Sequence, residues 1–394
     1  MKLNLPLLLD GDAAGFCADT PAELCLQQWM LANPEPVAGM QREYAAAGAD
    51  LLRAPTGGLS VLELSAFTDP PDSMALNSSI VDLTARAAQG KPVAGVIRSC
   101  GHLPEPCGPL PYTDLVDTYA QQALELELAG AQLLVLEGMR ALADLRAAVL
   151  GARQTALEIF ACMDASLPEE AGAADPLAML LCLQELGISA FGVGYCEPGA
   201  LARILERLAP YAKVPLLAQP ATGDASPAEL ARAAFELVAA GGRILMGDAQ
   251  ATPAHTAALR DMLDCFDFDA FPLPVRAEDT TLLLTDEERV YYLEEDFTTA
   301  GPIACETDMS EAILRAEAEG ADALLFHVRN VDDAYRLGQD AHMAGIAAVI
   351  LADSEEALEA ALLVYCGRPL VDSRSDADPD VMQTLAEGYG AIMR

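Results

Sequence analysis

Short apolar runs alternate with longer helix-like stretches over about the first 250 residues, and this alternation constrains the fold more than any other feature of the sequence. There are eight such runs, each with the length of a buried strand. They cover residues 5–9, 49–52, 93–97, 132–136, 157–162, 190–196, 214–218 and 243–246. Several of the stretches between them end at a glycine, as a helix C-cap in the left-handed region requires, for example at Gly48, Gly130 and Gly187. The segment therefore predicts strands that alternate with helices.

Strands that alternate with helices are joined by right-handed crossovers and run parallel. Eight such units in about 250 residues fit a closed barrel better than an open sheet. We therefore predict an α/β protein with a (β/α)8 TIM barrel over residues 1–265. The active end of such a barrel lies at the carboxyl ends of its strands, so residues that directly follow the apolar runs are the candidates for a site.

The rest of the chain predicts a linker and a smaller α/β domain. Residues 266–280 lose the periodicity and contain two prolines, which is typical of a linker. The alternation resumes over residues 281–394, with runs for only four or five parallel strands, too few for a closed barrel. This domain is predicted to be a partial barrel or a small open sheet. Because an open edge must be covered, we expect it to bury against the first domain or to form a homodimer.

The charge of the chain narrows the range of partners. The 394 residues include 60 acidic and 23 basic ones, for a formal charge of -37, which repels nucleic acids and anionic membranes. No stretch approaches ~18 uninterrupted apolar residues, so no membrane-spanning segment is expected. The ten cysteines follow no signal peptide and form no C-x-x-C pair. This predicts free thiols in a reducing, cytoplasmic compartment.

Two of the apolar runs are followed by residues that could hold a metal. Cys196 ends the run at 190–196, and Asp248 follows the run at 243–246. A catalytic zinc normally has three protein ligands, and Cys100 or His102, after the third run, could supply the third. The alternative is that Cys196 is a packing thiol in the core.

Charged residues also gather at the strand ends of this chain, which is poor in basic residues. Arg53, Arg98 and Arg140 fall at or just past the ends of apolar runs, and Asp12 follows the first run. Together the arginines could bind a carboxylate or a phosphate through paired hydrogen bonds. The alternative is that they form ion pairs with the many acidic residues nearby.

Several short motifs stand in an order and at a spacing that point to one protein family. Residues 44–50 read Tyr-Ala-Ala-Ala-Gly-Ala-Asp, and residues 192–196 read Gly-Val-Gly-Tyr-Cys. Further motifs lie at residues 9–15, 134–137, 220–223 and 246–255. With these motifs the sequence from residue 8 to about residue 263 resembles the homocysteine S-methyltransferase family, which includes the first module of cobalamin-dependent methionine synthase. The resemblance implies a TIM barrel that transfers a methyl group to a thiol.

The resemblance also implies zinc as the cofactor. In that family three thiolates hold a zinc ion, which carries the homocysteine sulfur as a thiolate. Cys196 matches the first of these ligands, whereas Asp248 and Ala249 stand where the family has paired cysteines. The implied catalytic and metal-binding residues are therefore Cys196 and, as a substituted ligand, Asp248. Ala249 cannot bind a metal.

Contacts to the substrate follow from the same resemblance. Glu137 would face the amino group of the ligand, or else be a solvated loop carboxylate, and Tyr195 replaces an asparagine of the family. The residues from Pro220 to Gly223 would offer backbone contacts. The full set of expected substrate-binding residues is Asp12, Arg53, Arg98, Glu137, Tyr195, Pro220 and Gly223.

The second region resembles part of the methylfolate-binding barrel of methionine synthase. Leu-Ala-Asp-Ser at 351–354 looks like its Ile-Asp-Ser, and Pro-Leu-Val-Asp-Ser at 369–373 looks like its Ile-Val-Asn-Ser. The sequence shows no cobalamin-type Asp-x-His-x-x-Gly, no dinucleotide-binding Gly-x-Gly-x-x-Gly for NAD and no P-loop for ATP.

The sequence thus predicts a protein like homocysteine S-methyltransferase and related to methionine synthase. Its chemistry is expected to be impaired or altered, because two of three zinc cysteines are missing. The alternative is a non-catalytic module that binds a small anion, or a partner of a corrinoid or folate methyltransferase. In either case the expected ligand is a small molecule, a thiol amino acid or another small anion.

Overall fold

The first part of the chain folds around a curled parallel sheet. The structure is a computed structural model and describes residues 4–16, 25–166, 174–277, 281–306 and 308–394. The sheet has eight strands in the order β1-β8-β7-β6-β5-β4-β3-β2. They are β1 (Leu7–Leu8), β2 (Leu52–Ala54), β3 (Val93–Arg98), β4 (Leu133–Met139), β5 (Glu158–Asp164), β6 (Ala190–Cys196), β7 (Leu216–Pro220) and β8 (Gly242–Leu245). All eight coincide with apolar runs of the sequence, which confirms the predicted α/β fold.

The two ends of this sheet meet. A parallel bridge joins Leu9, just after β1, to Leu51, just before β2. Beside it the Asp50 backbone N–H donates to the Leu8 carbonyl at 2.7 Å, and the Leu8 N–H donates to the Asp50 carboxylate at 2.7 Å. The sheet therefore curls round on itself as a TIM-like barrel, with its strand ends gathered at a common mouth.

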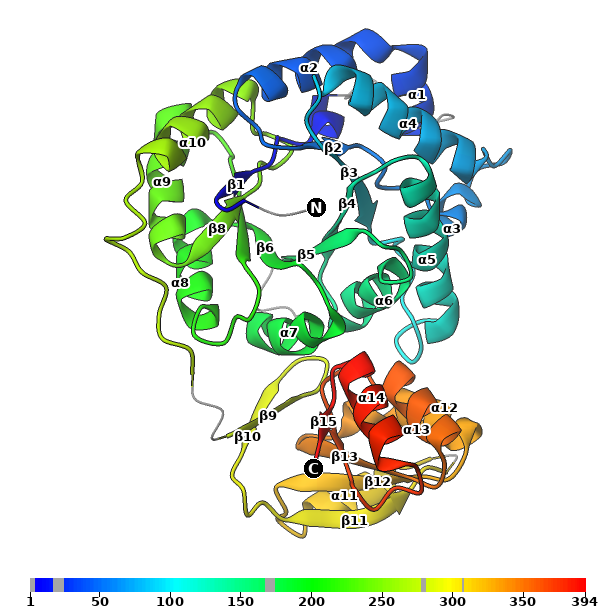
Figure 1. Cartoon of the computed structure of the whole chain (residues 1–394). Coiled ribbons are helices and arrows are strands. Elements are labelled where there is room, and N and C mark those ends of the chain that lie inside the picture. Colours follow the sequence, from blue (N-terminus) through cyan, green and yellow to red (C-terminus); the bar gives the residue numbers. More distant parts are fainter. Residues whose placement is uncertain (1–3, 17–24, 167–173, 278–280, 307) are drawn as a thin grey trace.

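Helices surround the barrel, as Figure 1 shows. They are α1 (Leu26–Ala32), α2 (Pro34–Ala46), α3 (Val61–Leu64), α4 (Ser73–Ala87), α5 (Tyr112–Leu128), α6 (Leu142–Ala152), α7 (Pro176–Leu183), α8 (Pro198–Leu208), α9 (Pro227–Ala239) and α10 (Pro253–Cys265). Short 3-10 turns occur at η1 (Ala13–Phe16) and η2 (Gln184–Leu186).

Each barrel strand is buried on both faces because side chains alternate across it. In β4, Leu133 and Val135 belong to the core inside the barrel, whereas Leu134 and Leu136 belong to the core between strands and helices. The interior is thus filled by side chains, and only residues at and beyond the strand ends can form a site.

The second sheet is smaller and open. It has five parallel strands in the order β11-β12-β13-β14-β15. The strands are β11 (Thr299–Ala304), β12 (Ala323–Val328), β13 (Ala347–Ala352), β14 (Leu370–Val371) and β15 (Ile392–Met393). The helices between them are α11 (Ser310–Glu317), α12 (Val331–Asp340), α13 (Glu355–Val364) and α14 (Pro379–Tyr389), with the 3-10 turn η3 (Ala341–Met343).

A hairpin covers one face of this open sheet. The antiparallel strands β9 (Leu282–Thr285) and β10 (Val290–Leu293) bring Leu284 and Leu293 into one core with residues of β12 and β13 such as Leu325 and Val349. The helices cover the other face around Phe326. The sequence did not predict β9 as a strand, because its three leucines directly follow the linker with no change in the sequence pattern between them. The hairpin thus covers a face of the second sheet, whereas the prediction concerned its open edges.

The two sheets are held together by arginines of the barrel helices. Arg146 of α6 is fully buried and donates to the carbonyl oxygens of Leu362 and Leu363 at 2.7 Å each. These carbonyls lie in the last turn of α13, where a cation is favourable. Arg153 donates to the Gly388 carbonyl in α14. The second domain thus packs beside the helices α6 and α7, below the barrel in Figure 1.

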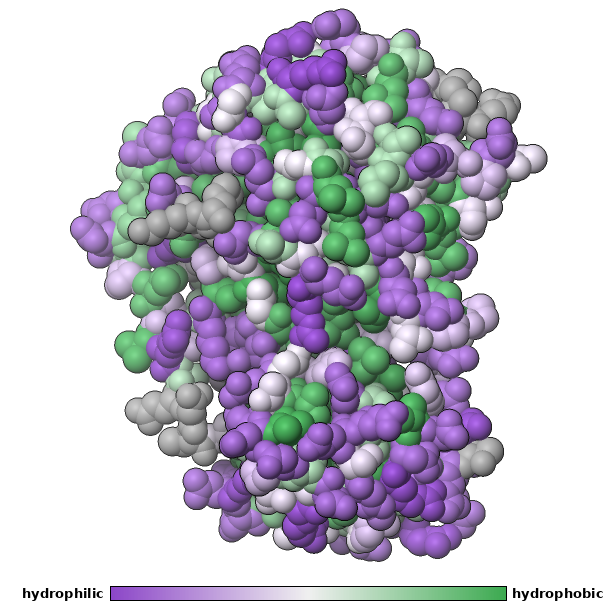
Figure 2. Space-filling view, turned by 45° about the vertical axis from the view of Figure 1, so that its right-hand side comes forward, coloured by the Kyte–Doolittle hydropathy of each residue, from purple (hydrophilic) through white to green (hydrophobic). Residues whose placement is uncertain are grey.

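The surface agrees with the acidic composition. The face shown in Figure 2 is mostly hydrophilic, with hydrophobic residues visible between hydrophilic ones. Among the residues that the structure describes, no helix has the length and apolar character to cross a membrane.

Candidate functional site

A cluster of charged side chains lies at the barrel mouth, at the ends of β1 to β4. Arg53 of β2 is at its centre, with a side chain only 3% exposed. Its Nε donates to Asp10 at 3.1 Å and its Nη1 to Glu137 at 2.9 Å. Its Nη2 donates to the backbone carbonyls of Asp10 at 2.7 Å and Gly247 at 2.6 Å. Arg53 thereby ties the ends of strands β1, β4 and β8 together.

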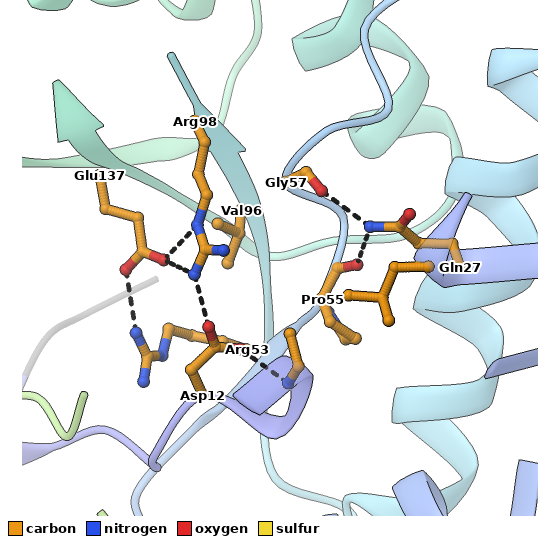
Figure 3. Close-up of a pocket in the computed structure, with 10 residues that line it drawn as sticks. Asp12, Gln27, Arg53, Pro55, Gly57, Val96, Arg98 and Glu137 are labelled. Carbon is orange, nitrogen blue, oxygen red and sulfur yellow. Dashed lines mark hydrogen bonds and ion pairs between the residues drawn. The ribbon is translucent and has the colours of Figure 1, made fainter. Parts of the chain in front are cut away.

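Arg98, the last residue of β3, extends this cluster toward solvent. Its Nη2 donates to Asp12 at 2.5 Å, and its Nε and Nη2 donate to Glu137 at 3.0 and 2.7 Å. Glu137 therefore bridges both arginines, as Figure 3 shows. The Arg98 side chain is 36% exposed, against 3% for Arg53, so Arg98 is the arginine that a ligand can reach.

The pKa values of two acids in the cluster, Asp10 and Asp12, are shifted in opposite directions. Burial raises the pKa of Asp10 to about 7, although Arg53 beside it acts the other way. Burial also acts to raise the pKa of Asp12, but the guanidinium groups of Arg98 and Arg53 outweigh it and hold that pKa below its usual range. The mouth thus contains one carboxylate that is firmly ionised and one that titrates near neutral pH.

A cavity of about 240 Å³ adjoins this cluster at the mouth. It is lined by Asp12, Arg98, Gly138, Tyr195, Gln219 and Ala249. A smaller space of about 20 Å³ lies on the other side of Asp12 and Arg98, toward Gln27 and Pro55 (Figure 3). The larger cavity has the size of a small amino acid and presents both signs of charge.

Two residues of this cavity have unusual surroundings. Tyr195 has φ of +64°, which an L-residue with a large side chain adopts only at a local energetic cost. Burial raises the pKa of its hydroxyl, so the group is a neutral donor at physiological pH. Gln219 is buried, and its Oε1 has no hydrogen-bond partner among the described residues. Buried polar atoms normally have partners, so this oxygen is an exception among the described residues.

Cys196 and Asp248 lie on the opposite side of the mouth, at the ends of β6 and β8. Burial, and next the nearby Asp164, raises the pKa of the Cys196 thiol to about 11. Without a metal the thiol is therefore protonated at neutral pH, and a protonated thiol is a poor nucleophile.

The Asp248 carboxylate is engaged by the backbone. One oxygen accepts the N–H of Thr222 at 2.8 Å, and the other accepts the N–H groups of Gln250 and Ala251 at 3.0 Å each. These bonds fix the turn after β8 to the turn after β7, which contains Gly223 with φ of +51°. Pro220 ends β7. Asp248 thus holds the loops from Pro220 to Gly223 in place.

Arg140 takes no part in the charge cluster. Its Nε donates to Asp164 at 3.0 Å and its Nη2 to Ser166 at 3.1 Å. The three arginines predicted from the sequence are therefore all engaged by acidic residues. Sequence reasoning missed Asp10 and Gln219 as members of the site. Both directly follow or end an apolar run, which is the signal that could have identified them.

A comparison with protein families settles the origin of this barrel. The family model described as homocysteine S-methyltransferase matches residues 7–263, well over half of the chain. The chain belongs to the homocysteine S-methyltransferase family. The resemblance drawn from the sequence motifs is therefore confirmed.

Solved structures of the homocysteine methyltransferase MmuM from Escherichia coli share the fold of this family member. The metallated form is 21% identical with a TM-score of 0.52, and the oxidised form is 22% identical with a TM-score of 0.55. Each comparison covers 65% of this chain and 95% of the solved chain. Comparison with curated proteins gives no match.

The residues of this family member do not fit a three-thiolate zinc site. Cys196 is the only one of the three expected cysteines present, the Asp248 carboxylate accepts three backbone N–H groups, and Ala249 has no donor atom. Cys100 is buried, and burial raises the pKa of its thiol, while His102 is exposed. Within the described ranges, no three or more His, Cys, Asp or Glu side chains lie together as a metal site would require.

Proposed function

We propose that this member of the homocysteine S-methyltransferase family binds a small zwitterionic ligand, of the thiol amino acid class, at its barrel mouth without zinc-thiolate chemistry. The 240 Å³ cavity places the exposed Arg98 beside Asp12 and close to Glu137. A guanidinium can pair with the carboxylate of an amino acid, and carboxylates can pair with its ammonium group. The neutral Tyr195 hydroxyl and the Gln219 amide add uncharged polar contacts.

One observation supports the loss of the family chemistry more than any other. Asp248 stands at the position of a family cysteine, and its carboxylate accepts hydrogen bonds from three backbone N–H groups. If Asp248 turned toward a metal, the N–H of the buried Thr222 would lose its acceptor, whereas the Ala251 N–H would keep only the Asp248 backbone carbonyl at 3.2 Å. A thiol substrate would then lack the metal that lowers its pKa, so it would stay protonated and react slowly.

A second candidate is methyl transfer to homocysteine itself, which the family match over residues 7–263 favours. The methyl group would come from a corrinoid or folate partner, because no cobalamin motif occurs in the chain. This candidate requires a way to deprotonate the thiol other than the three cysteines of the family.

Metal analysis combined with a homocysteine titration tests the proposal. We expect purified protein with far less than one zinc per chain, homocysteine binding by calorimetry, and no change in either for Cys196→Ala. Arg98→Gln should weaken binding roughly tenfold or more, since a charge-assisted contact is lost. Arg140→Gln, which changes the charge equally outside the cavity, is the matched control.

The double variant Asp248→Cys and Ala249→Cys is the positive control for the metal analysis. It restores the cysteines of the family, and we expect it to gain zinc. Near-stoichiometric zinc in the wild type that disappears in Cys196→Ala would overturn the proposal. So would chelator-sensitive methylation of homocysteine from methylcobalamin or methylfolate. Methylation that a chelator leaves unchanged would establish the second candidate.

A further inference from the structure

Strand β6 has an irregularity where it reaches the barrel mouth. In its pairing with β7, Gly194 lies opposite Gln219 and Cys196 lies opposite Pro220, so Tyr195 is an extra residue between these two pairs. An extra residue on one strand is a β-bulge. Bulges are frequent beside functional sites, where they change the direction of a side chain. The positive φ of Tyr195, at +64°, marks the same position.

The bulge directs the Tyr195 side chain into the mouth. A Cβ at Gly192 would lie 2.8 Å from Leu217 of the core inside the barrel, so the even-numbered positions of β6 face inward. Regular alternation would therefore direct Tyr195 outward, toward the helices. Instead, Tyr195 lines the cavity of about 240 Å³ at the mouth. Its place in the cavity thus follows from the bulge.

The Tyr195 side chain reaches from β6 toward β4. Its hydroxyl oxygen lies 3.7 Å from the point where a Cβ on Gly138 would stand. Gly138 belongs to β4, and β5 lies between β4 and β6 in the sheet. Gly138 itself has a φ of +73° and lies at an irregularity in the pairing of β4 with β5. The tyrosine therefore crosses the end of one strand and forms a wall of the cavity.

This cavity has a charged side and an uncharged side. Asp12 and Arg98 form an ion pair beyond the ends of β1 and β3. Tyr195 and Gln219 lie on the other side of the mouth, at the ends of β6 and β7. Of the described residues that line the cavity, Tyr195 is the only aromatic one. An amino acid held by Arg98 and Asp12 therefore extends its side chain toward the Tyr195 ring.

We propose that Tyr195 determines how long a ligand side chain the mouth accepts. This inference rests on the proposed function, because it takes the ligand to be an amino acid bound through its charged groups. The ring limits the ligand to a short side chain with a free thiol, such as that of homocysteine. It excludes amino acids whose sulfur carries a longer alkyl group. Selection of this kind comes from steric overlap with the wrong ligand as well as from contacts with the right one.

Calorimetric titration with a graded series of ligands tests this role. The series is L-homocysteine, L-methionine, L-ethionine and S-butyl-L-homocysteine, which share the charged groups and differ only beyond the sulfur. In the wild type we expect S-butyl-L-homocysteine to bind roughly tenfold more weakly than homocysteine or worse. In Tyr195→Asn this difference should disappear, because asparagine tolerates a positive φ and lacks the ring. Tyr195→Gly, which suits the positive φ better still, is a second truncated variant.

Two further variants are the controls. Tyr195→Phe removes the hydroxyl but keeps the ring, so it should weaken all four ligands alike and preserve their order. Tyr335→Asn makes the same replacement at an exposed position of α12 and should leave every affinity unchanged.

The outcomes separate this inference from the proposed function. A wild type that binds S-butyl-L-homocysteine as tightly as homocysteine would overturn the role of Tyr195 alone. Truncated variants that discriminate as strongly as the wild type would do the same. A wild type that binds none of the four ligands would overturn the proposed function, and this inference with it.

Discussion

The two sides of the barrel mouth are built from equivalent strand ends but in different ways. On the side of β1 to β4, Arg53 and four other side chains form one ion-paired cluster, in which Arg98 is the most exposed member. On the side of β6 to β8, Cys196 is a thiol that is protonated without a metal. The Asp248 carboxylate there links the turn after β7 to the turn after β8 by hydrogen bonds. In the proposed function the two sides have different parts. The first side would recognise a charged ligand, whereas the second side lacks the groups that would activate a thiol.

The largest effect should follow from removing the centre of the first side. Arg53→Met would leave the buried Asp10 without its cation and would leave the buried Glu137 with Arg98 alone. We expect a loss of about 3–5 kcal/mol in the free energy of unfolding, measured by urea denaturation. The matched control is Arg86→Met, whose exposed partner is Asp82 one helical turn away. If both variants lose an equally small free energy of unfolding, the cluster does not stabilise the fold in this way.

The titration of Asp10 should give the next largest effect. Its pKa in the fold is about 7, above the ordinary value of 3.8, so between pH 4 and 7 the folded chain holds a proton that the unfolded chain has released. Stability from this group is complete below pH 4, falls as the pH rises to 7, and is constant above that. The slope can reach about 1.4 kcal/mol per pH unit. Asp10→Asn should remove this slope in urea midpoints measured across pH 4–8.

The control for Asp10→Asn is Asp82→Asn, because Asp82 lies in an exposed ion pair. The difference in stability between wild type and Asp10→Asn should depend on pH. Parallel pH profiles for wild type and Asp10→Asn would contradict the argument that burial dominates at Asp10.

On the second side of the mouth, Asp248→Ala should have a moderate effect. It removes the acceptors of three backbone N–H groups, of which those of Thr222 and Ala251 belong to buried residues. We expect a loss of about 1–3 kcal/mol in urea denaturation, because the buried Thr222 N–H is left without a partner and the Ala251 N–H keeps only the Asp248 backbone carbonyl. Asp248→Asn, which keeps one acceptor oxygen, should fall between wild type and alanine. An alanine variant as stable as the wild type would mean that Asp248 is free for another role.

The sequence predicted the structure where the hydrophobic periodicity and the residue types at the ends of the apolar runs indicate the same element. Eight apolar runs became the eight barrel strands, and the charged residues directly after them became the mouth cluster. Glycine caps such as Gly48 and Gly130 have the positive φ that was inferred for them, at 100° and 93°. These features could be predicted because burial and backbone geometry act on neighbouring residues.

The sequence could not indicate how the charges pair across strands. Arg53 is 84 residues from Glu137, and Arg98 is 86 residues from Asp12, so only the closed barrel brings them into contact. The strand β9 was missed because pairing with β10 and the open sheet, rather than its own residues, decides its conformation.

The smallest effect concerns the reactivity of Cys196. Because burial raises the pKa of its thiol to about 11, less than about 1% of it is thiolate at pH 8. Iodoacetamide at pH 8 should therefore modify the exposed Cys107 and Cys265 first, as read by peptide mass spectrometry, and leave Cys196 largely unmodified. Cys196→Ala should cost only about 1 kcal/mol, as for a small packing residue. Alkylation of Cys196 as fast as that of Cys107 would show an activated thiolate and bring the second side of the mouth back into the chemistry.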